Sequence, residues 1–188
     1  MALAAKCKLE SISPLSMSRY YEEPKKDKET PAAYDERTWR ERLHYDEQGM
    51  VFINPMAFKW CVTDAAQLGG KKVEGRRGAT YAKFFMSGIL VLEGMPLGIH
   101  KDSVPTERLF VPANGKHGSG VRVWRHFPRI DEWKGEVTIH ILNRTITKEV
   151  FEEHLHEAGK FVGLGRFRPQ TGGFYGRFKV AKISYEEE

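Results

Sequence analysis

The chain has 188 residues, of which 40% are hydrophobic and 29% are charged, and its formal net charge is +5. This length suits one domain with a sizeable core, and the modest positive charge favours an anionic partner without identifying it. Cys7 and Cys61 lie far apart and outside any C-x-x-C pair, which argues against a zinc site or a disulfide framework. No run approaches the roughly 20 apolar residues that span a bilayer, so we expect a cytoplasmic protein with no membrane partner.

The first predicted element is a strand over residues 3–9, where apolar and charged residues alternate. The composition then changes: residues 20–48 hold nine acids, six bases and almost no aliphatic side chains. We interpret residues 17–50 as an insertion before the first helix, serving either as a partner-binding arm or as a solvated surface segment. Within it, four residues are expected to anchor a short helix against the body, namely Tyr34, Trp39, Leu43 and Tyr45.

Asn54 and Pro55 predict the start of the first helix, with asparagine as N-cap and proline at the first helical position. Leu68-Gly69-Gly70 predicts its end. The next segment, 70–78 (GKKVEGRRG), is expected to be an unstructured basic loop. Charged runs are usually only solvated, but we take the bases of this loop as candidate contacts to nucleic acid: Lys71, Lys72, Arg76 and Arg77.

The middle of the chain is rich in β-forming residues. Residues 81–92 (YAKFFMSGILVL) predict a strand that is bent at Gly88, and residues 109–111 and 121–124 predict a hairpin. The hairpin tip, 114–120, contains Lys116 and is either a finger over a ligand or an ordinary long loop. Residues 136–142 alternate strictly and predict a further strand.

Thr147 predicts the cap of a second helix with a core stripe of apolar residues, and residues 178–183 predict the last strand. Residues 186–188 form an acidic tail that we expect to be disordered. Between the helix and the strand lies the segment 163–179 (GLGRFRPQTGGFYGRFK), where glycines alternate with arginines and aromatic residues. No acid occurs between Ala158 and Tyr185 to neutralise six lysines and arginines.

Glycines let a backbone approach a ligand closely, arginines pair with phosphate, and exposed aromatic rings stack on bases. The segment therefore predicts a nucleic-acid contact, although a glycine-rich turn before a strand would have the same composition. One of the adjacent residues Phe174 and Tyr175 should face the core. The candidate binding residues here are Arg166, Arg168, Arg177, Phe174 and Tyr175, and Lys59 adds charge one turn into the first helix.

The order of elements predicts a single α+β domain over residues 1–188. It has a ferredoxin-like or RRM-like antiparallel sheet with two helices on one face, a β-hairpin and a long N-terminal insertion. The free face of the sheet and the two basic loops would then hold the ligand.

Two motifs carry a resemblance to a known family. Residues 51–59 (VFINPMAFK) resemble the start of the corresponding helix in the RAMP superfamily, whose backbone subunits assemble CRISPR effector complexes, and residues 163–176 resemble its C-terminal glycine-rich loop. The family's usual Pro-Gly-Ser-Ser run is replaced here by Asn54 to Ala57. The chain is also similar to proteins of temperate bacteriophages, which would place it in the cytoplasm of a bacterial host.

The resemblance implies a non-catalytic protein that binds single-stranded RNA or DNA, with RNA favoured. It implies possible CRISPR-subunit partners and homo-oligomers along a strand. A second hypothesis is an anti-CRISPR protein that imitates or displaces a CRISPR subunit. A third is an endoribonuclease with a histidine as general base, for which no local signature selects among His44, His100, His117 and His126. The sequence has no phosphate-binding loop, nucleophile elbow or metal motif, so no cofactor is expected.

Overall fold

The computed structural model describes residues 3–113, 118 and 120–187, and its centre is one antiparallel four-stranded sheet with the strand order β3-β7-β1-β8. The strands span Ile89–Leu90 (β3), Lys134–Ile141 (β7), Leu3–Ser11 (β1) and Phe178–Glu187 (β8). Helices follow β1 and β7 in the chain, so the connectivity is ferredoxin-like. The predicted α+β fold class is confirmed.

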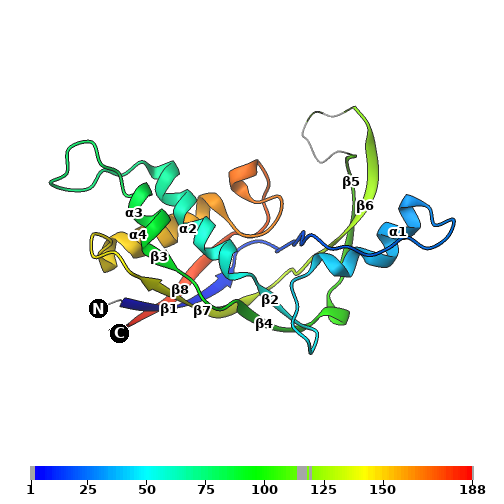
Figure 1. The fold of residues 1–188 in the computed structure, drawn as a ribbon, viewed down its shortest axis with the longest axis horizontal. Helices are drawn as coiled ribbons and strands as arrows, with labels where there is room; N and C mark the ends of the chain where they lie inside the picture. The colour runs from blue at the N-terminus through cyan, green and yellow to red at the C-terminus, as the bar shows by residue number, and fades with distance from the viewer. Residues whose placement is uncertain (1–2, 114–117, 119, 188) are drawn as a thin grey trace.

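Three helices cover one face of this sheet (Figure 1). They are α2 (Pro55–Gly69), α3 (Ala82–Gly88) and α4 (Lys148–Glu157), and α4 continues as a π-helical turn, η3 (Ala158–Val162). Side chains of β1 alternate between the two faces of the sheet because the side-chain period of a strand is two residues. The core between the sheet and the helices includes Ala5, Cys7 and Leu9 of β1, Phe58 and Cys61 of α2, and Phe151 and Leu155 of α4.

The predicted helix ends are confirmed. The Asn54 side chain accepts a hydrogen bond from the Met56 backbone nitrogen at 2.8 Å, and Pro55 occupies the first turn of α2. Gly70 closes α2 in the left-handed region with φ 57°. Thr147 caps α4 by accepting from the backbone nitrogen of Val150. Asparagine and threonine oxygens stabilise these starts because the first amides of a helix have no intrahelical acceptor.

Two smaller sheets lie outside the central one. Strand β2 (Met50–Ile53) pairs with β4 (Met95–His100), and a 3-10 turn, η2 (Lys101–Ser103), follows β4. Strands β5 (Thr106–Pro112) and β6 (Arg122–Pro128) form the predicted hairpin, which projects from the body (Figure 1). The tip residues 114–117 and 119 lie outside the described residues, and Lys116 is among them.

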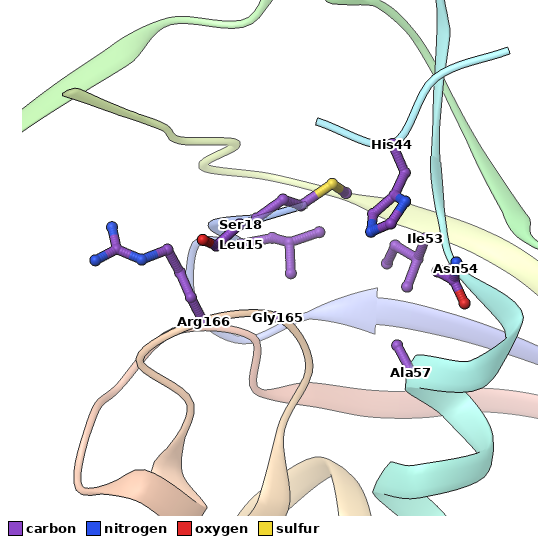
Figure 2. Close-up of a pocket in the computed structure, with 9 residues that line it drawn as sticks. Leu15, Ser18, His44, Ile53, Asn54, Ala57, Gly165 and Arg166 are labelled. Carbon is purple, nitrogen blue, oxygen red and sulfur yellow. The ribbon is translucent and has the colours of Figure 1, made fainter. Parts of the chain in front are cut away.

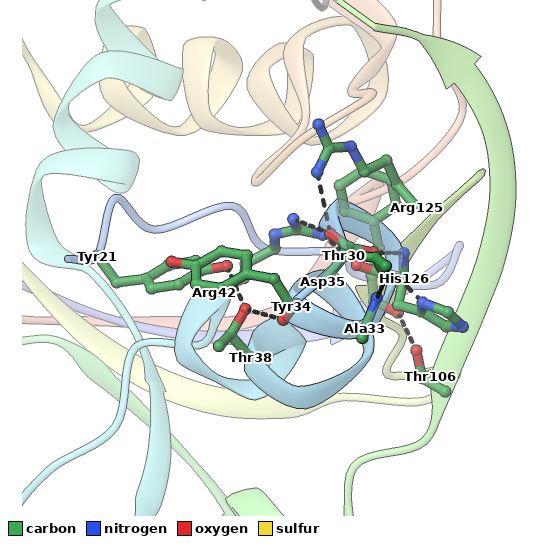
Figure 3. A network of polar contacts seen from close by, with 11 residues as sticks. Tyr21, Thr30, Ala33, Tyr34, Asp35, Thr38, Arg42, Thr106, Arg125 and His126 are labelled. Carbon is green, nitrogen blue, oxygen red and sulfur yellow. Dashed lines mark hydrogen bonds and ion pairs between the residues drawn. The ribbon is translucent and has the colours of Figure 1, made fainter. Parts of the chain in front are cut away.

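The insertion folds back onto the hairpin. It contains α1 (Pro31–Thr38) and a 3-10 turn, η1 (Trp39–Arg42), and Trp39 and Leu43 are buried as expected. Its most buried acid, Asp35, contacts β6 (Figure 3). The insertion is therefore an anchored part of the fold that supports one strand of the hairpin.

The strand predicted over residues 81–92 is wrong, because α3 occupies most of that segment and only Ile89–Leu90 form a strand. Tyr81, Phe85 and Gly88 are buried, which is a helical spacing of four and three residues. Gly88 is the last residue of this helix and does not bend a strand. A side chain is not accommodated at this position, because a Cβ would lie 2.5 Å from the Cβ of Asn143. The helical spacing was not recognised because the segment is rich in residues that favour strands.

Two further details differ from the expectations. The tail is ordered as far as Glu187, because β8 continues to that residue and Glu186 pairs with Lys6 of β1 at 2.6 Å. Strand β4 was not predicted, since Met95-Pro96 is typical of a turn. Both strands depend on pairing with distant segments, which the local pattern does not reveal.

Candidate nucleic-acid groove

Two pockets of about 320 and 330 Å³ adjoin one another, because Ser18 and Arg166 line both. We refer to them as the first and second pockets of one groove. The first pocket lies between the start of α2, the segment after β1 and the glycine-rich loop, and is also lined by Leu15, Met17, His44, Ile53, Asn54, Ala57 and Gly165 (Figure 2). The second lies under the inner face of the hairpin and is also lined by Arg42, Val111, Pro112, Ala113, Arg125, Phe127 and Phe167.

The glycine-rich loop is folded tightly on itself. A Cβ added at Gly173 would lie 1.7 Å from the carbonyl oxygen of Phe167, and one at Gly176 would lie 1.9 Å from that of Leu164. Glycine is required at both positions because a side chain cannot be accommodated against another backbone segment. The Arg166 backbone nitrogen donates to the carbonyl of Ser16 at 2.9 Å. The loop therefore fixes the backbone of Arg166 at the boundary between the two pockets.

The guanidinium of Arg166 is held between aromatic rings. Its central carbon lies 3.0 Å from the centroid of the Phe127 ring and 3.8 Å from that of Phe167. Its Nη1 atom is buried and has no hydrogen-bond partner among the described residues. Burial, with a smaller contribution from the positive charge of Arg42, lowers the pKa of Arg166 to about 9. A charged group in this condition is stabilised by an incoming anion.

A second cationic cluster supports the hairpin side of the groove. Asp35, 1% exposed, accepts from Arg42 Nη2 at 2.5 Å and from the backbone nitrogen of His126 at 2.6 Å, and Arg125 Nη1 lies at 3.5 Å (Figure 3). Burial raises the pKa of Asp35, but the His126 amide and the Arg42 guanidinium outweigh it, so the pKa lies below its ordinary value. Asp35 is thus shared by two guanidinium groups, those of Arg42 and Arg125, so this cluster keeps a positive charge.

Phe167 is an aromatic side chain that is open to this groove. It is 39% exposed and lines the second pocket, and its backbone is in the left-handed region with φ 50°. Non-glycine residues adopt that region at an energetic cost, and such strain concentrates at binding sites. Its ring is 6.3 Å from that of Tyr175, which is itself buried. Phe167 therefore offers a stacking surface that Tyr175 does not.

Tyr175 has a structural role instead. Its hydroxyl donates to Glu107 of β5, and burial together with this bond raises its pKa to about 12. Phe174 is 51% exposed and stacks on Tyr175 at 4.2 Å between centroids. Of the two adjacent aromatic residues, Tyr175 faces inward and Phe174 outward, as the alternation predicted.

The first pocket has apolar walls and a polar rim. Leu15 and Ile53 are buried, and Ala57 lies on the first turn of α2 (Figure 2). Burial, and to a lesser extent the charge of Arg19, lowers the pKa of His44. The imidazole is therefore uncharged at neutral pH and can both donate and accept a hydrogen bond.

The free face of the sheet is lined by paired charges. Its charged side chains pair across the strands: Lys6 with Glu186, Lys8 with Glu136, and Lys179 with Glu10. Strand alternation places His140 of β7 on this face, but no Phe, Tyr or Trp of β1 or β7. Neither pocket of the groove is lined by these strands, and the expectation that this face holds a nucleic acid stays a prediction.

The two predicted basic loops do not meet. The loop 70–78 follows the C-terminal end of α2, whereas the glycine-rich loop lies along the helix: Gly165 lines the first pocket with Asn54, and Arg168 lies 3.8 Å from Asp64. Within the loop 70–78, Lys71 pairs with Glu153 of α4, the Arg76 guanidinium lies 5.2 Å from the Phe84 ring, and Lys72 and Arg77 are exposed. No residue of the loop 70–78 lines either pocket of the groove.

The remaining predicted residues lie outside the groove. Arg168 is 3.8 Å from Asp64 of α2 and donates to Gln170, and Arg177 donates to the carbonyl of Lys160. Lys59 is half-buried on α2 and does not line the first pocket. Of the predicted binding residues, Arg166 lines the groove.

The other groove residues come from segments that gave no binding signal. Arg42 and His44 lie in the insertion, and Arg125 and Phe127 lie in β6. Arg125 and Phe127 come after the predicted hairpin strand 121–124, so the sequence pattern did not indicate them.

Other features of the chain have no evident ligand. No cluster of three or more potential metal ligands occurs within the described ranges. Both cysteines are buried and free, and burial raises the pKa of each thiol. Over the same part of the chain, no helix is long and apolar enough to cross a bilayer.

The fold and the groove together define a ferredoxin-like domain with a basic, aromatic-lined groove beneath a β-hairpin. No protein-family model matches the chain, and no curated protein matches it either. Among solved structures, a chain in the cryo-EM structure of the type III-B Cmr-beta bound to cognate target RNA is similar, with a TM-score of 0.58 and 13% identity. The match covers 99% of this chain and 61% of that chain, so this chain spans about three fifths of its length.

The crystal structure of Cmr6 from Pyrococcus furiosus is also similar, with a TM-score of 0.49 and 14% identity over 96% of this chain and 99% of that one. At these identities the Cmr-beta match shows a shared fold. The similarity is one of fold alone, and the resemblance to the RAMP superfamily stays a prediction.

Proposed function

We propose that the protein binds single-stranded RNA in the groove, without catalysis, as a component of an RNA-guided assembly. The observation that carries the proposal is Arg166, a guanidinium held between Phe127 and Phe167 with a buried nitrogen that has no partner among the described residues. A phosphate would supply the missing negative charge, and the exposed part of the Phe167 ring would stack on a base. An acidic peptide would satisfy the charge but would not use the ring.

The similarity to a chain of the RNA-bound Cmr-beta structure supports RNA over DNA as the partner. The shape of the groove agrees with a single strand, because its two pockets are separate hollows along one path and not a broad surface for a duplex. Single strands are recognised through bases that are splayed out from the backbone.

A salt titration with labelled single-stranded RNA tests the proposal. The logarithm of the affinity should fall with the logarithm of the salt concentration, with a slope of roughly −0.7 for each phosphate contact. A slope of about −1.4 is expected for two phosphate contacts, since Arg166 and Arg125 are the two groove guanidiniums least neutralised by Asp35. Absence of binding at low salt would contradict the proposal and favour the anti-CRISPR hypothesis, in which the groove meets a protein.

The non-catalytic assignment has its own test. His44 is the groove histidine, and a hydrolytic site would need a second acid or base beside it. The first pocket contains no carboxylate and no second histidine. Incubation of the protein with end-labelled RNA should therefore leave the strand intact, and cleavage that disappears in His44→Ala would overturn the assignment.

A further inference from the structure

We propose that the first pocket of the groove receives one nucleobase turned out of the bound strand. This inference rests on the proposed function and adds a specific subsite to it. Arg166 lies at the edge of this pocket, and its guanidinium points away from His44, Ile53 and Asn54 (Figure 2). A nucleotide with its phosphate at that guanidinium would place its base in the first pocket by turning it back past Arg166.

The size and walls of the pocket suit a base. Its volume of about 320 Å³ is at the lower end of the range of about 300–1,000 Å³ for pockets that bind small molecules. Leu15, Met17 and Ile53 are 1–4% exposed and supply apolar surface for the faces of a flat ring. An elongated apolar side chain would fit such walls as well, but it would leave the polar rim without partners.

The rim offers hydrogen bonds of the kind that a base edge needs. The Oδ1 atom of Asn54 already accepts from the Met56 backbone nitrogen, so its amide group keeps two free donors. His44 is uncharged because burial lowers its pKa, so its ring presents one donor and one acceptor. Ser18 is exposed and contributes a hydroxyl. Neutral donors and acceptors around apolar walls favour a base over a phosphate at this position.

Ala57 allows the pocket to be filled without disturbing the core. It lines the pocket on α2 and is half-buried, so a larger side chain there would extend into the hollow. Its neighbour Met56 is 46% exposed and does not line the pocket. Ala57→Phe is therefore the test variant, and Met56→Phe is a matched control that adds a ring of the same size on the same turn.

The experiment compares binding of oligouridine with binding of a base-free ribose-phosphate strand of the same length. Wild-type protein and Met56→Phe should bind the strand with bases about tenfold or more tightly than the base-free strand. In Ala57→Phe this ratio should fall several-fold, while binding of the base-free strand stays unchanged. Circular dichroism and thermal melting establish that both variants are folded.

Three results would overturn the inference. An unchanged ratio in a folded Ala57→Phe protein would show that no base enters the pocket. Equal loss of affinity for both strands would show that the new ring obstructs the backbone path. Free uridine monophosphate that binds as tightly as the strand, with the same loss in Ala57→Phe, would assign the pocket to a mononucleotide. If none of the strands binds the wild-type protein, the proposed function itself fails.

Discussion

Arg166 combines two properties that oppose each other in the unbound protein. Its contacts with Phe127 and Phe167 stabilise the guanidinium, but its buried nitrogen lacks a partner among the described residues and its pKa is lowered to about 9. Groups that serve binding often cost stability in the free protein. Arg166→Met should therefore raise the melting temperature by about 2–4 °C, which corresponds to about 1 kcal/mol for a chain of this length.

The same substitution should weaken RNA binding by tenfold or more, because the phosphate partner is lost. Thermal denaturation and fluorescence anisotropy measure the two effects. Arg168→Met is the control, since Arg168 belongs to the same loop but faces Asp64. It should change affinity by less than about threefold. A less stable Arg166→Met protein with unchanged affinity would show that the arginine only supports the loop.

At the scale of residues, the sequence could indicate Arg166 as a binding residue but could not predict its contacts in the fold. The absence of acids between Ala158 and Tyr185 predicted unpaired arginines. In the structure, acids of other segments pair with these bases: Asp64 with Arg168, and Glu10 with Lys179. Neutralisation depends on contacts across the fold, so the local charge count overstated the number of free cations. Arg42 and Arg125 were missed for a related reason: their common partner Asp35 lies in the insertion with Arg42 and meets Arg125 of β6 only through the fold.

The shape of the glycine-rich loop should be essential for binding. Gly173→Ala places a Cβ 1.7 Å from the Phe167 carbonyl oxygen, so the loop must open and carry Arg166 and Phe167 away from the groove. We expect a loss of RNA affinity of tenfold or more, measured by anisotropy, with the sheet intact by circular dichroism. Gly172→Asn is the control, because Gly172 has φ +81° and open space around it, and asparagine tolerates that region. Equal losses in both variants would contradict the role of this close approach.

The anchoring of the insertion should depend on pH through Asp35. Its pKa in the fold lies below the ordinary value of 3.8, so the stability that its charge contributes is fully present above about pH 5. It is lost as the pH falls below 3.8 and through the lowered pKa of the folded state. Asp35→Asn leaves Arg42 and Arg125 with no carboxylate and should lower the free energy of unfolding by about 3 kcal/mol at pH 7.

The difference in unfolding free energy between wild type and Asp35→Asn should shrink as the pH is lowered from 7 to 3. Urea denaturation at several pH values measures it. Glu36→Gln serves as the control, since Glu36 is the next residue in α1 and is exposed. A difference that stays constant down to pH 3 would show that Asp35 does not anchor the insertion through its charge.

At the scale of elements, helix caps and a strict alternation of apolar and polar residues were sufficient to predict a helix or a strand where they were present. Asn54 and Thr147 marked the two helix starts of the ferredoxin-like frame, and the pattern after Lys134 marked its central strand. Residues 81–92 failed because Phe84, Phe85 and Ile89 have high strand propensity, while tertiary packing of Tyr81 and Phe85 selected a helix. The candidate groove could not be assembled from elements alone, since six separate segments line it.

At the scale of the whole molecule, the outer face of the hairpin remains to be explained. Phe110 and Trp124 are 47% and 52% exposed, pair across the strands at 5.2 Å between centroids, and have Arg108 and Arg122 over their rings. Val111, Arg125 and Phe127 on the opposite face line the groove, so strand alternation directs Phe110 and Trp124 away from it. Aromatic rings and arginines on an exposed surface are typical of protein interfaces.

We therefore predict that copies bound along one strand contact each other through this outer face. The insertion is the acidic counterpart, and a head-to-tail contact between two different surfaces adds subunits without closing a ring. Light scattering should give one protein on a short oligonucleotide and a mass that rises stepwise with strand length. Phe110→Ala with Trp124→Ala should keep wild-type affinity for the short strand and lose the stepwise growth. One protein per strand at every length, in the wild type, would refute this assembly and favour a protein that imitates a single CRISPR subunit.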